Sequence, residues 1–180
     1  ASLEQIWEMI LSFEGYSFCK PHSASYARVS FQAAYLKTHH PAEFMAAVIE
    51  NGGGFYSAFA YVSEARRMGV QILPPDVNES EWTFSVVGNA IRFGLGAIKG
   101  VGESAGEAVL AARRSQGSFR NLAHLLLEVD AQAANQKVFD ALVKSGACDS
   151  LGGGHRAALA AAISGLAEQA GRRRREIEAG

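Results

Sequence analysis

Apolar residues recur every three to four positions along most of the chain, and this spacing predicts helices with one buried face. The first stretch carries Leu3, Ile6, Trp7, Ile10 and Leu11, and no helix-start signal precedes it. Because the chain also begins with alanine rather than methionine, we expect it to be a piece of a longer protein.

Three further helices are predicted before residue 70, because proline and serine start signals and glycine stop signals bracket apolar repeats. They cover about residues 21–39, 41–51 and 56–68. The longest carries an apolar stripe made of Tyr26, Ala27, Val29, Phe31, Ala33, Ala34, Tyr35 and Leu36. Residues 1–69 are therefore expected to form an all-helical unit.

The pattern changes to a period of two after residue 70, which is typical of half-buried strands. Residues 70–73 form a short β-like run, and residues 82–87 alternate as a strand does. Gly88-Asn89 then predicts a two-residue hairpin turn before a partner strand at 90–93. We expect residues 70–93 to form a small β element that connects two helical parts.

Helical spacing returns after Gly94 in shorter pieces, over about residues 102–114, 119–129 and 135–144, with a last helix from about residue 154. Arg172–Arg175 either continue that helix or fray from it. Four successive arginines circle a helix and cannot share one buried face, so residues 171–180 are expected to be a basic tail or linker. The predicted fold class is mainly α with a small β-hairpin or sheet element.

Composition excludes several classes of protein. Hydrophobic residues make up 48% and charged residues 19% of the 180 residues, which excludes general disorder and fibrous repeats. A net charge of −1 favours no particular partner, and no apolar run approaches the ~18 residues of a membrane span. Cys19 and Cys148 show no CxxC spacing, which excludes a cysteine zinc site and fits a cytoplasmic protein.

The most informative stretch for function runs from Gly94 to Glu103. Two glycines flank Val101 just before a predicted helix, which leaves backbone N–H groups free to point outward, and Lys99 can add a positive charge. The surroundings match a helix-hairpin-helix, which grips a DNA phosphate through backbone amides. We expect Lys99, Gly100, Val101 and Gly102 to contact DNA; the alternative is a glycine-bent turn between helices.

A second candidate hairpin follows the helix predicted at 135–144, at Ser145-Gly146-Ala147-Cys148. In this interpretation Lys144 and Gly146 contact DNA, and the two hairpins hold both strands of a duplex. The alternative is a corner between two helices, with Gly146 as a helix C-cap.

A third candidate site lies at the start of the helix predicted over 21–39, where Lys20, His22 and Tyr26 occur. His22 and Tyr26 are four residues apart and therefore share a face of the helix. A cation, an imidazole and an aromatic ring beside free N–H groups suit a nucleotide triphosphate. The alternative is a capped helix with a half-buried tyrosine.

No catalytic residue, metal ligand or cofactor site is predicted in this chain. His39-His40 mark a helix end, and the aspartates never form the D-x-D pair that a two-metal centre would favour. The chain is therefore expected to be inactive alone.

Together these stretches resemble the α subunit of bacterial DNA polymerase III over about residues 5–165. The residues that carry the resemblance are Gly15–Ala27, Tyr35–Lys37, Pro41–Met45, Arg66–Gly69, Leu73–Asn78, Gly94–Glu103 and Gly146–Gly152. Cys19 and Pro21 depart from the pattern, since Asn and Ser are common there in the family.

The resemblance implies that residues 1–69 belong to the polymerase fingers and that residues 94–170 form a tandem helix-hairpin-helix DNA-binding domain. It implies that Lys20, His22 and Tyr26 face the incoming nucleotide and that Lys99–Gly102 face DNA. The catalytic aspartates and their Mg²⁺ would lie in a palm domain outside this chain. Implied partners are duplex primer-template DNA, the incoming dNTP and other polymerase III holoenzyme subunits.

The whole protein would then be a DNA-directed DNA polymerase, a nucleotidyltransferase of DNA replication. Three alternatives stay open. They are an error-prone paralogue used in damage-induced synthesis, a stand-alone helix-hairpin-helix DNA-binding adaptor, and a helical scaffold whose glycines serve only as caps.

Overall fold

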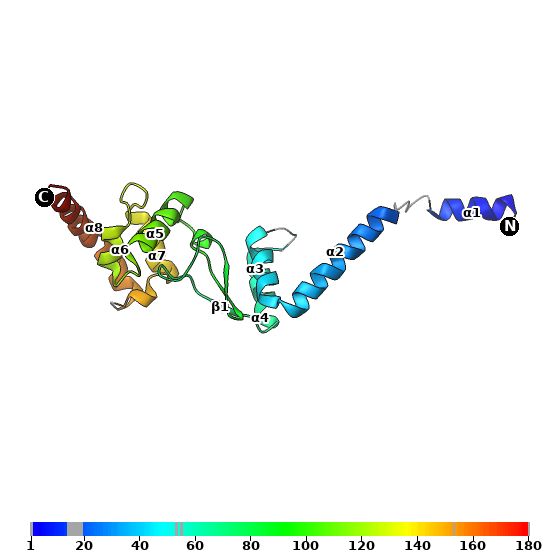
Figure 1. Ribbon diagram of the computed structural model, residues 1–180, viewed down its shortest axis with the longest axis horizontal. Coiled ribbons are helices and arrows are strands. Elements are labelled where there is room, and N and C mark those ends of the chain that lie inside the picture. The colour runs from blue at the N-terminus through cyan, green and yellow to red at the C-terminus, as the bar shows by residue number, and fades with distance from the viewer. Residues whose placement is uncertain (1, 14–19, 53, 55, 153, 180) are drawn as a thin grey trace.

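The computed structural model describes residues 2–13, 20–52, 54, 56–152 and 154–179, and their fold is mainly α with one small sheet, as predicted (Figure 1). The helices are α1 (Leu3–Phe13), α2 (Lys20–His39), α3 (Pro41–Asn51), α4 (Ala58–Arg67), α5 (Glu103–Gln116), α6 (Leu122–Glu128), α7 (Gln136–Ser145) and α8 (Arg156–Ala179). The strands are β1 (Gln71–Leu73), β2 (Ser85–Val87) and β3 (Ala90–Arg92). Short 3₁₀ turns occupy Leu95–Ala97 and Asp149–Leu151.

The sheet has the order β1-β3-β2, with β1 parallel and β2 antiparallel to β3. Ile91 lies at its centre, opposite Ile72 on one side and Val86 on the other, and is fully buried. Gly88 has φ +62°, the conformation that a two-residue hairpin turn requires at its first central position. The predicted hairpin is confirmed.

The strand predicted over residues 82–87 is shorter in the structure, because the chain bends at Trp82 and Thr83. The carbonyls of Glu81 and Trp82 accept hydrogen bonds from the amides of Leu95 and Gly96, at 2.9 and 3.0 Å, instead of pairing with a strand. The indole ring then lies so close to Gly96 and Gly106 that an added Cβ would fall 2.9 and 2.2 Å from ring atoms.

Two separate hydrophobic cores result from this bend. Phe84 and Val86 pack on the first core, which α3, α4 and the sheet form around Met45, Ile49 and Ile91. Trp82 packs on the second core, which extends from Val77 and Leu95 through α5, α6, α7 and α8. The largest fully buried side chains of the second core include Leu95, Leu125, Leu142 and Ile163.

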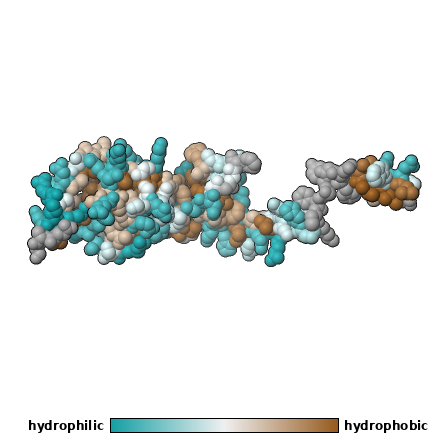
Figure 2. All heavy atoms as spheres, turned by 90° about the horizontal axis from the view of Figure 1, so that it is seen from above, coloured by the Kyte–Doolittle hydropathy of each residue, from teal (hydrophilic) through white to brown (hydrophobic). Residues whose placement is uncertain are grey.

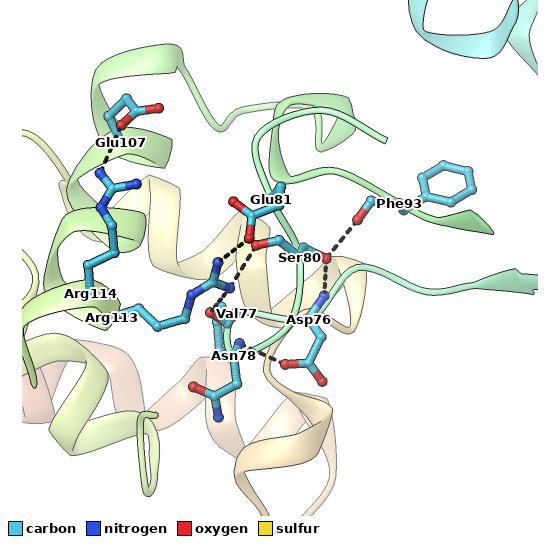
Figure 3. A network of polar contacts seen from close by, with 9 residues as sticks. All are labelled: Asp76, Val77, Asn78, Ser80, Glu81, Phe93, Glu107, Arg113 and Arg114. Atoms are coloured by element: carbon cyan, nitrogen blue, oxygen red, sulfur yellow. Dashed lines mark hydrogen bonds and ion pairs between the residues drawn. The ribbon is translucent and has the colours of Figure 1, made fainter. Parts of the chain in front are cut away.

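A polar network holds the segment 76–81, which connects the two cores, against α5 (Figure 3). The fully buried Ser80 hydroxyl donates to the Phe93 carbonyl at 2.7 Å and accepts from the Asp76 amide at 2.9 Å. Arg113 of α5 donates to the Ser80 carbonyl at 2.7 Å and to the Glu81 carboxylate at 3.0 Å. The connecting segment is thereby held against the helix that follows the candidate hairpin.

Helix α2 confirms the predicted helix but not a buried apolar stripe. Its side chains Phe31 and Tyr35 are 78% and 60% exposed, and of the stripe only Ala33 is half-buried. Figure 1 shows α2 extending away from α3, and Figure 2 shows further apolar surface on α1. Near its C-terminal end α2 is tied to α4 by an ion pair of 3.2 Å between Lys37 and Glu64.

None of the helices in the described ranges is both long enough and apolar enough to cross a membrane.

Candidate nucleic-acid interface

The first hairpin comprises residues 98–102 and lies between the 3₁₀ turn and α5. The Ile98 amide donates to Leu95 and the Val101 amide donates to Ile98, both at 3.1 Å, which closes the hairpin. Ile98 and Val101 are buried, whereas Lys99, Gly100 and Gly102 are exposed. The two apolar residues therefore anchor the hairpin, and the lysine and glycines are presented to solvent.

The exposed amides of the hairpin have no partners within the described part of the chain. No hydrogen bond there uses the N–H groups of Lys99, Gly100 or Gly102 as donors. Gly102 is the N-cap of α5 and provides no side chain to cap the first helical amides. These donors lie at the start of α5, and unpaired N–H groups at the positive end of a helix dipole suit an anion.

Gly100 explains how the hairpin reaches α7. Its φ is +96°, and an added Cβ would lie 3.4 Å from the Cβ of Ala141. A glycine is favoured by this left-handed conformation, and the hairpin thereby lies against α7.

The hairpin and α7 together line a depression of about 710 Å³. Lys99 lies on the hairpin side of this depression, and Lys137 and Lys144 lie on the α7 side. The structure therefore brings together two lysines that the sequence analysis selected on separate motifs. Lys137 was missed, although its spacing of seven residues from Lys144 would have placed both on one face of a helix.

One acidic side chain shares this surface. Asp140 also lines the depression and lies 2.6 Å from the ammonium of Lys144. The Lys144 side chain is 68% exposed and that of Asp140 is 38% exposed, so this pair contributes little to stability and leaves Lys144 able to exchange partners.

Gly146 is the C-cap of α7, as the alternative interpretation of the second hairpin supposed. It has φ +89°, its amide donates to Val143 at 3.1 Å, and the Ala147 amide donates to Leu142 at 3.0 Å. This is the Schellman arrangement of a helix end. The Gly146 amide is thus engaged inside the chain, unlike the amides of the first hairpin.

The corner after Gly146 is closed by an ion pair between Arg156 and Asp149. The Arg156 guanidinium holds the pKa of the Asp149 carboxyl below its ordinary value. Nearby, burial raises the pKa of the Cys148 thiol to about 12, so this cysteine stays protonated and unreactive.

His22 and Tyr26 lie side by side on the first turns of α2. Their ring centroids are 4.5 Å apart in an edge-to-face arrangement, which confirms that they share a face. Tyr26 is 61% exposed rather than half-buried in this chain. Helix α2 begins at Lys20, but the side chain of Lys20 lies outside the described residues.

Within the described ranges, no group of three or more His, Cys, Asp or Glu side chains could hold a metal ion.

Comparison with known proteins connects this geometry to a family. A family model described as the helix-hairpin-helix motif matches residues 69–159. The chain is also similar to proteins named DNA polymerase III subunit alpha. Identity is 46% over 157 residues with that of Escherichia coli K12, covering 86% of this chain and 13% of the relative.

Two further relatives give the same picture. The protein from Mycobacterium tuberculosis H37Rv is 42% identical over 153 residues, covering 84% of this chain and 13% of its own length. The protein from Saccharopolyspora erythraea is 39% identical over 175 residues, covering 93% of this chain and 15% of its own length. The chain therefore spans about one seventh of the length of these relatives.

Proposed function

Because this chain belongs to the helix-hairpin-helix family, we propose that its second half binds duplex DNA by contacts to the phosphate backbone. The observation that carries this proposal is the depression where Lys99 and Gly100 of the hairpin meet Lys137 and Lys144 of α7, next to hairpin amides that have no partner in the described chain. Backbone amides and lysines recognise phosphate without reading base edges, so binding is independent of sequence.

The hairpin and the lysines have different tasks in this proposal. The amides of residues 99, 100 and 102 donate hydrogen bonds to one phosphate group and fix its position at the positive end of α5. Lys99 and Lys137 neutralise charge on the same or neighbouring phosphates. Lys144 joins them when the DNA displaces Asp140 from its ammonium group. We assign Gly146 a structural role.

In the full-length protein this module would hold the primer-template duplex of a replicative DNA polymerase. The similarity to segments of DNA polymerase III subunit alpha supports this placement in the cytoplasmic replication machinery, together with the other holoenzyme subunits. Chemistry would be supplied by parts of the protein outside this chain. The gene distinguishes this proposal from the stand-alone DNA-binding adaptor. An upstream reading frame that encodes a palm with paired aspartates would support the polymerase, and an isolated short frame would support the adaptor.

The hairpin proposal can be tested at a single amide. Gly102 has φ −80°, which proline can adopt, and an added Cβ would meet nothing within 4 Å, so proline and alanine are both suitable substitutions. Gly102→Pro removes the N–H, whereas Gly102→Ala retains it. We expect the proline variant to bind duplex DNA about tenfold more weakly, since a hydrogen bond to a charged group contributes about 1.5 kcal/mol or more.

Fluorescence anisotropy with a labelled duplex measures this difference, and thermal unfolding shows that both variants are folded. Equal affinities of the folded proline and alanine variants would mean that the glycines only shape a turn.

We further propose that His22 and Tyr26, with Lys20, contact the incoming nucleotide in the full-length protein. The exposed ring pair at the N-terminal end of α2 supports this role, since neither core uses it. His22→Ala and Tyr26→Phe in the full-length polymerase should lower kcat or raise KM for the nucleotide while the melting temperature stays unchanged. Normal kinetics with a lowered melting temperature would instead assign both residues to packing.

A further inference from the structure

A second basic depression lies on the opposite end of α8 from the corner at Gly146, where α8 crosses the start of α6. Its volume is about 390 Å³, and its polar lining consists of Arg120, Asn121, His124, Gln169 and Arg173. The two arginines come from segments more than fifty residues apart in the sequence. None of the roles described above uses them.

Neither arginine of this depression has an ion-pair partner among the described residues. Among the described residues, Arg67, Arg113, Arg114, Arg156 and Arg172 each lie within 4 Å of a carboxylate, but Arg120 and Arg173 do not. Both side chains are exposed. The carboxylate of Glu128 lies 3.7 Å from Nε2 of His124 and not against either arginine. Two guanidinium groups that line one depression without carboxylate partners of their own suit an anionic ligand.

The backbone of Arg120 is held on both sides. The preceding residue, Phe119, exchanges two hydrogen bonds with the Asn78 side chain, at 2.7 and 3.0 Å. The Arg120 amide itself donates to Nδ1 of His124 at 3.2 Å, and the His124 amide donates to the Asn121 side chain. His124 and Asn121 therefore position Arg120 at the rim of the depression.

The position of Arg173 is fixed by the contacts of the next residue, Arg174. The Arg174 guanidinium donates to the carbonyls of Leu127 at 2.9 Å and Val129 at 2.6 Å, and also to that of Leu126. These carbonyls end α6 and carry the negative end of its dipole, which a guanidinium satisfies. This clamp fixes α8 against α6 and leaves Arg173, one residue earlier, directed to the depression.

The depression also has a defined position relative to the lysine surface. Lys137 borders a groove that Ala160 and Ile163 of α8 line on the other side. From Ile163 to Arg173 the helix advances by ten residues, or about 15 Å at 1.5 Å per residue. Duplex DNA carries one charge per ~1.7 Å of its axis, so a duplex that lies along α8 would present phosphates at both positions.

We propose that Arg120 and Arg173 bind a further backbone phosphate of the same duplex, with Gln169 as an additional donor. This inference rests on the proposed DNA-binding function and extends its contact surface along α8. Guanidinium forks fit phosphate oxygens in pairs, which explains why arginines rather than lysines occupy this depression.

The test compares salt dependence of duplex binding in the 180-residue chain. Arg120→Gln/Arg173→Gln removes two charges from the depression. The matched control, Arg66→Gln/Arg175→Gln, removes two exposed arginines that also lack ion-pair partners among the described residues and do not line it. Each lost phosphate contact should reduce the slope of log K against log salt by about 0.9, so the test variant, which loses one phosphate contact, should lose about 0.9.

The control should keep the slope of the wild type, and thermal unfolding should show all variants folded. A second variant, Arg173→Lys, should keep most of the slope but bind more weakly. Test and control variants with the same slope would overturn the inference while leaving DNA binding by the hairpin intact. A wild-type chain that binds no duplex would instead overturn the proposed function from which the inference proceeds.

Discussion

At the scale of single residues, two glycines differ in whether their backbone conformation and surroundings would tolerate a side chain. Gly146 has φ +89°, and an added Cβ would lie 2.3 Å from the Arg156 guanidinium. Gly165 lies within α8, and an added Cβ would meet nothing within 4 Å. The same substitution should therefore have opposite effects at the two sites.

We expect Gly146→Ala to lower the free energy of unfolding by about 1–2 kcal/mol, because alanine is strained in the left-handed region and must displace Arg156. Gly165→Ala should raise it by about 0.5–1 kcal/mol through helix propensity. Urea unfolding of both variants measures the difference. A stabilising effect of alanine at position 146 would contradict the C-cap geometry.

The four consecutive arginines at positions 172–175 show what a sequence pattern cannot predict. Four consecutive arginines were expected to be solvated, and Arg172, Arg173 and Arg175 are exposed as expected. Arg174 differs because it satisfies the carbonyls that end α6, forty-five or more residues earlier. Periodicity cannot identify which of four identical side chains meets a distant helix end.

At the scale of elements, α2 depends on few contacts for its orientation. Glu64 of α4 accepts hydrogen bonds from Lys37 of α2 and from Arg67, at 3.2 and 2.7 Å. Hydrogen bonds from Arg67 and then Lys37 hold the pKa of the Glu64 carboxyl at about 2, below its ordinary value of 4.5.

This lowered pKa predicts a pH dependence. A carboxyl whose pKa is lower in the folded state stabilises the fold fully above its unfolded pKa. The contribution is therefore complete above about pH 4.5 and is lost as the pH falls toward about 2. We expect Glu64→Gln to reduce the free energy of unfolding slightly at pH 6, since salt bridges at the surface are weak. The difference from the wild type should be smaller at pH 3, because part of the carboxylate's contribution is already lost there.

Chemical unfolding at both pH values checks this, with Glu79→Gln as a control because Glu79 is exposed and has no ion pair in the described part of the chain. A difference between wild type and Glu64→Gln that is larger at pH 3 than at pH 6 would contradict the assignment.

The elements that depend on local signals were predictable from sequence. Pro41 starts α3, Asn135 caps α7 through hydrogen bonds to the amides of Lys137 and Val138, and Gly88 turns the hairpin. The bend at Trp82 was not predictable, because it depends on backbone pairing with residues 95 and 96. Alternation of side chains cannot show that the chain leaves the sheet.

At the scale of the whole molecule, the contact between the hairpin and α7 is the feature that makes a site from separate motifs. Lys99 and Gly100 were selected from the sequence, and so was Lys144, but their meeting in one depression depends on the packing of the second core. For the same reason the sequence pattern does not indicate Lys137 or the pair Arg120 and Arg173.

Overall net charge conceals this arrangement. The chain has a net charge of −1, yet the depression collects three lysines and one aspartate from two elements. A local surplus of positive charge is sufficient for contact with phosphates, since binding depends on the charges that reach the DNA and not on the total.

The most direct test of the account is the salt dependence of duplex DNA binding by the 180-residue chain. Two to three lysine–phosphate contacts predict that log K falls by about 1.8 to 2.7 per tenfold increase in salt, and the phosphate bound by Arg120 and Arg173 would add about 0.9. Duplexes of unrelated sequence should give the same curve. Absence of duplex binding at about 50 mM salt, or binding insensitive to salt, would contradict a phosphate-gripping role for this chain.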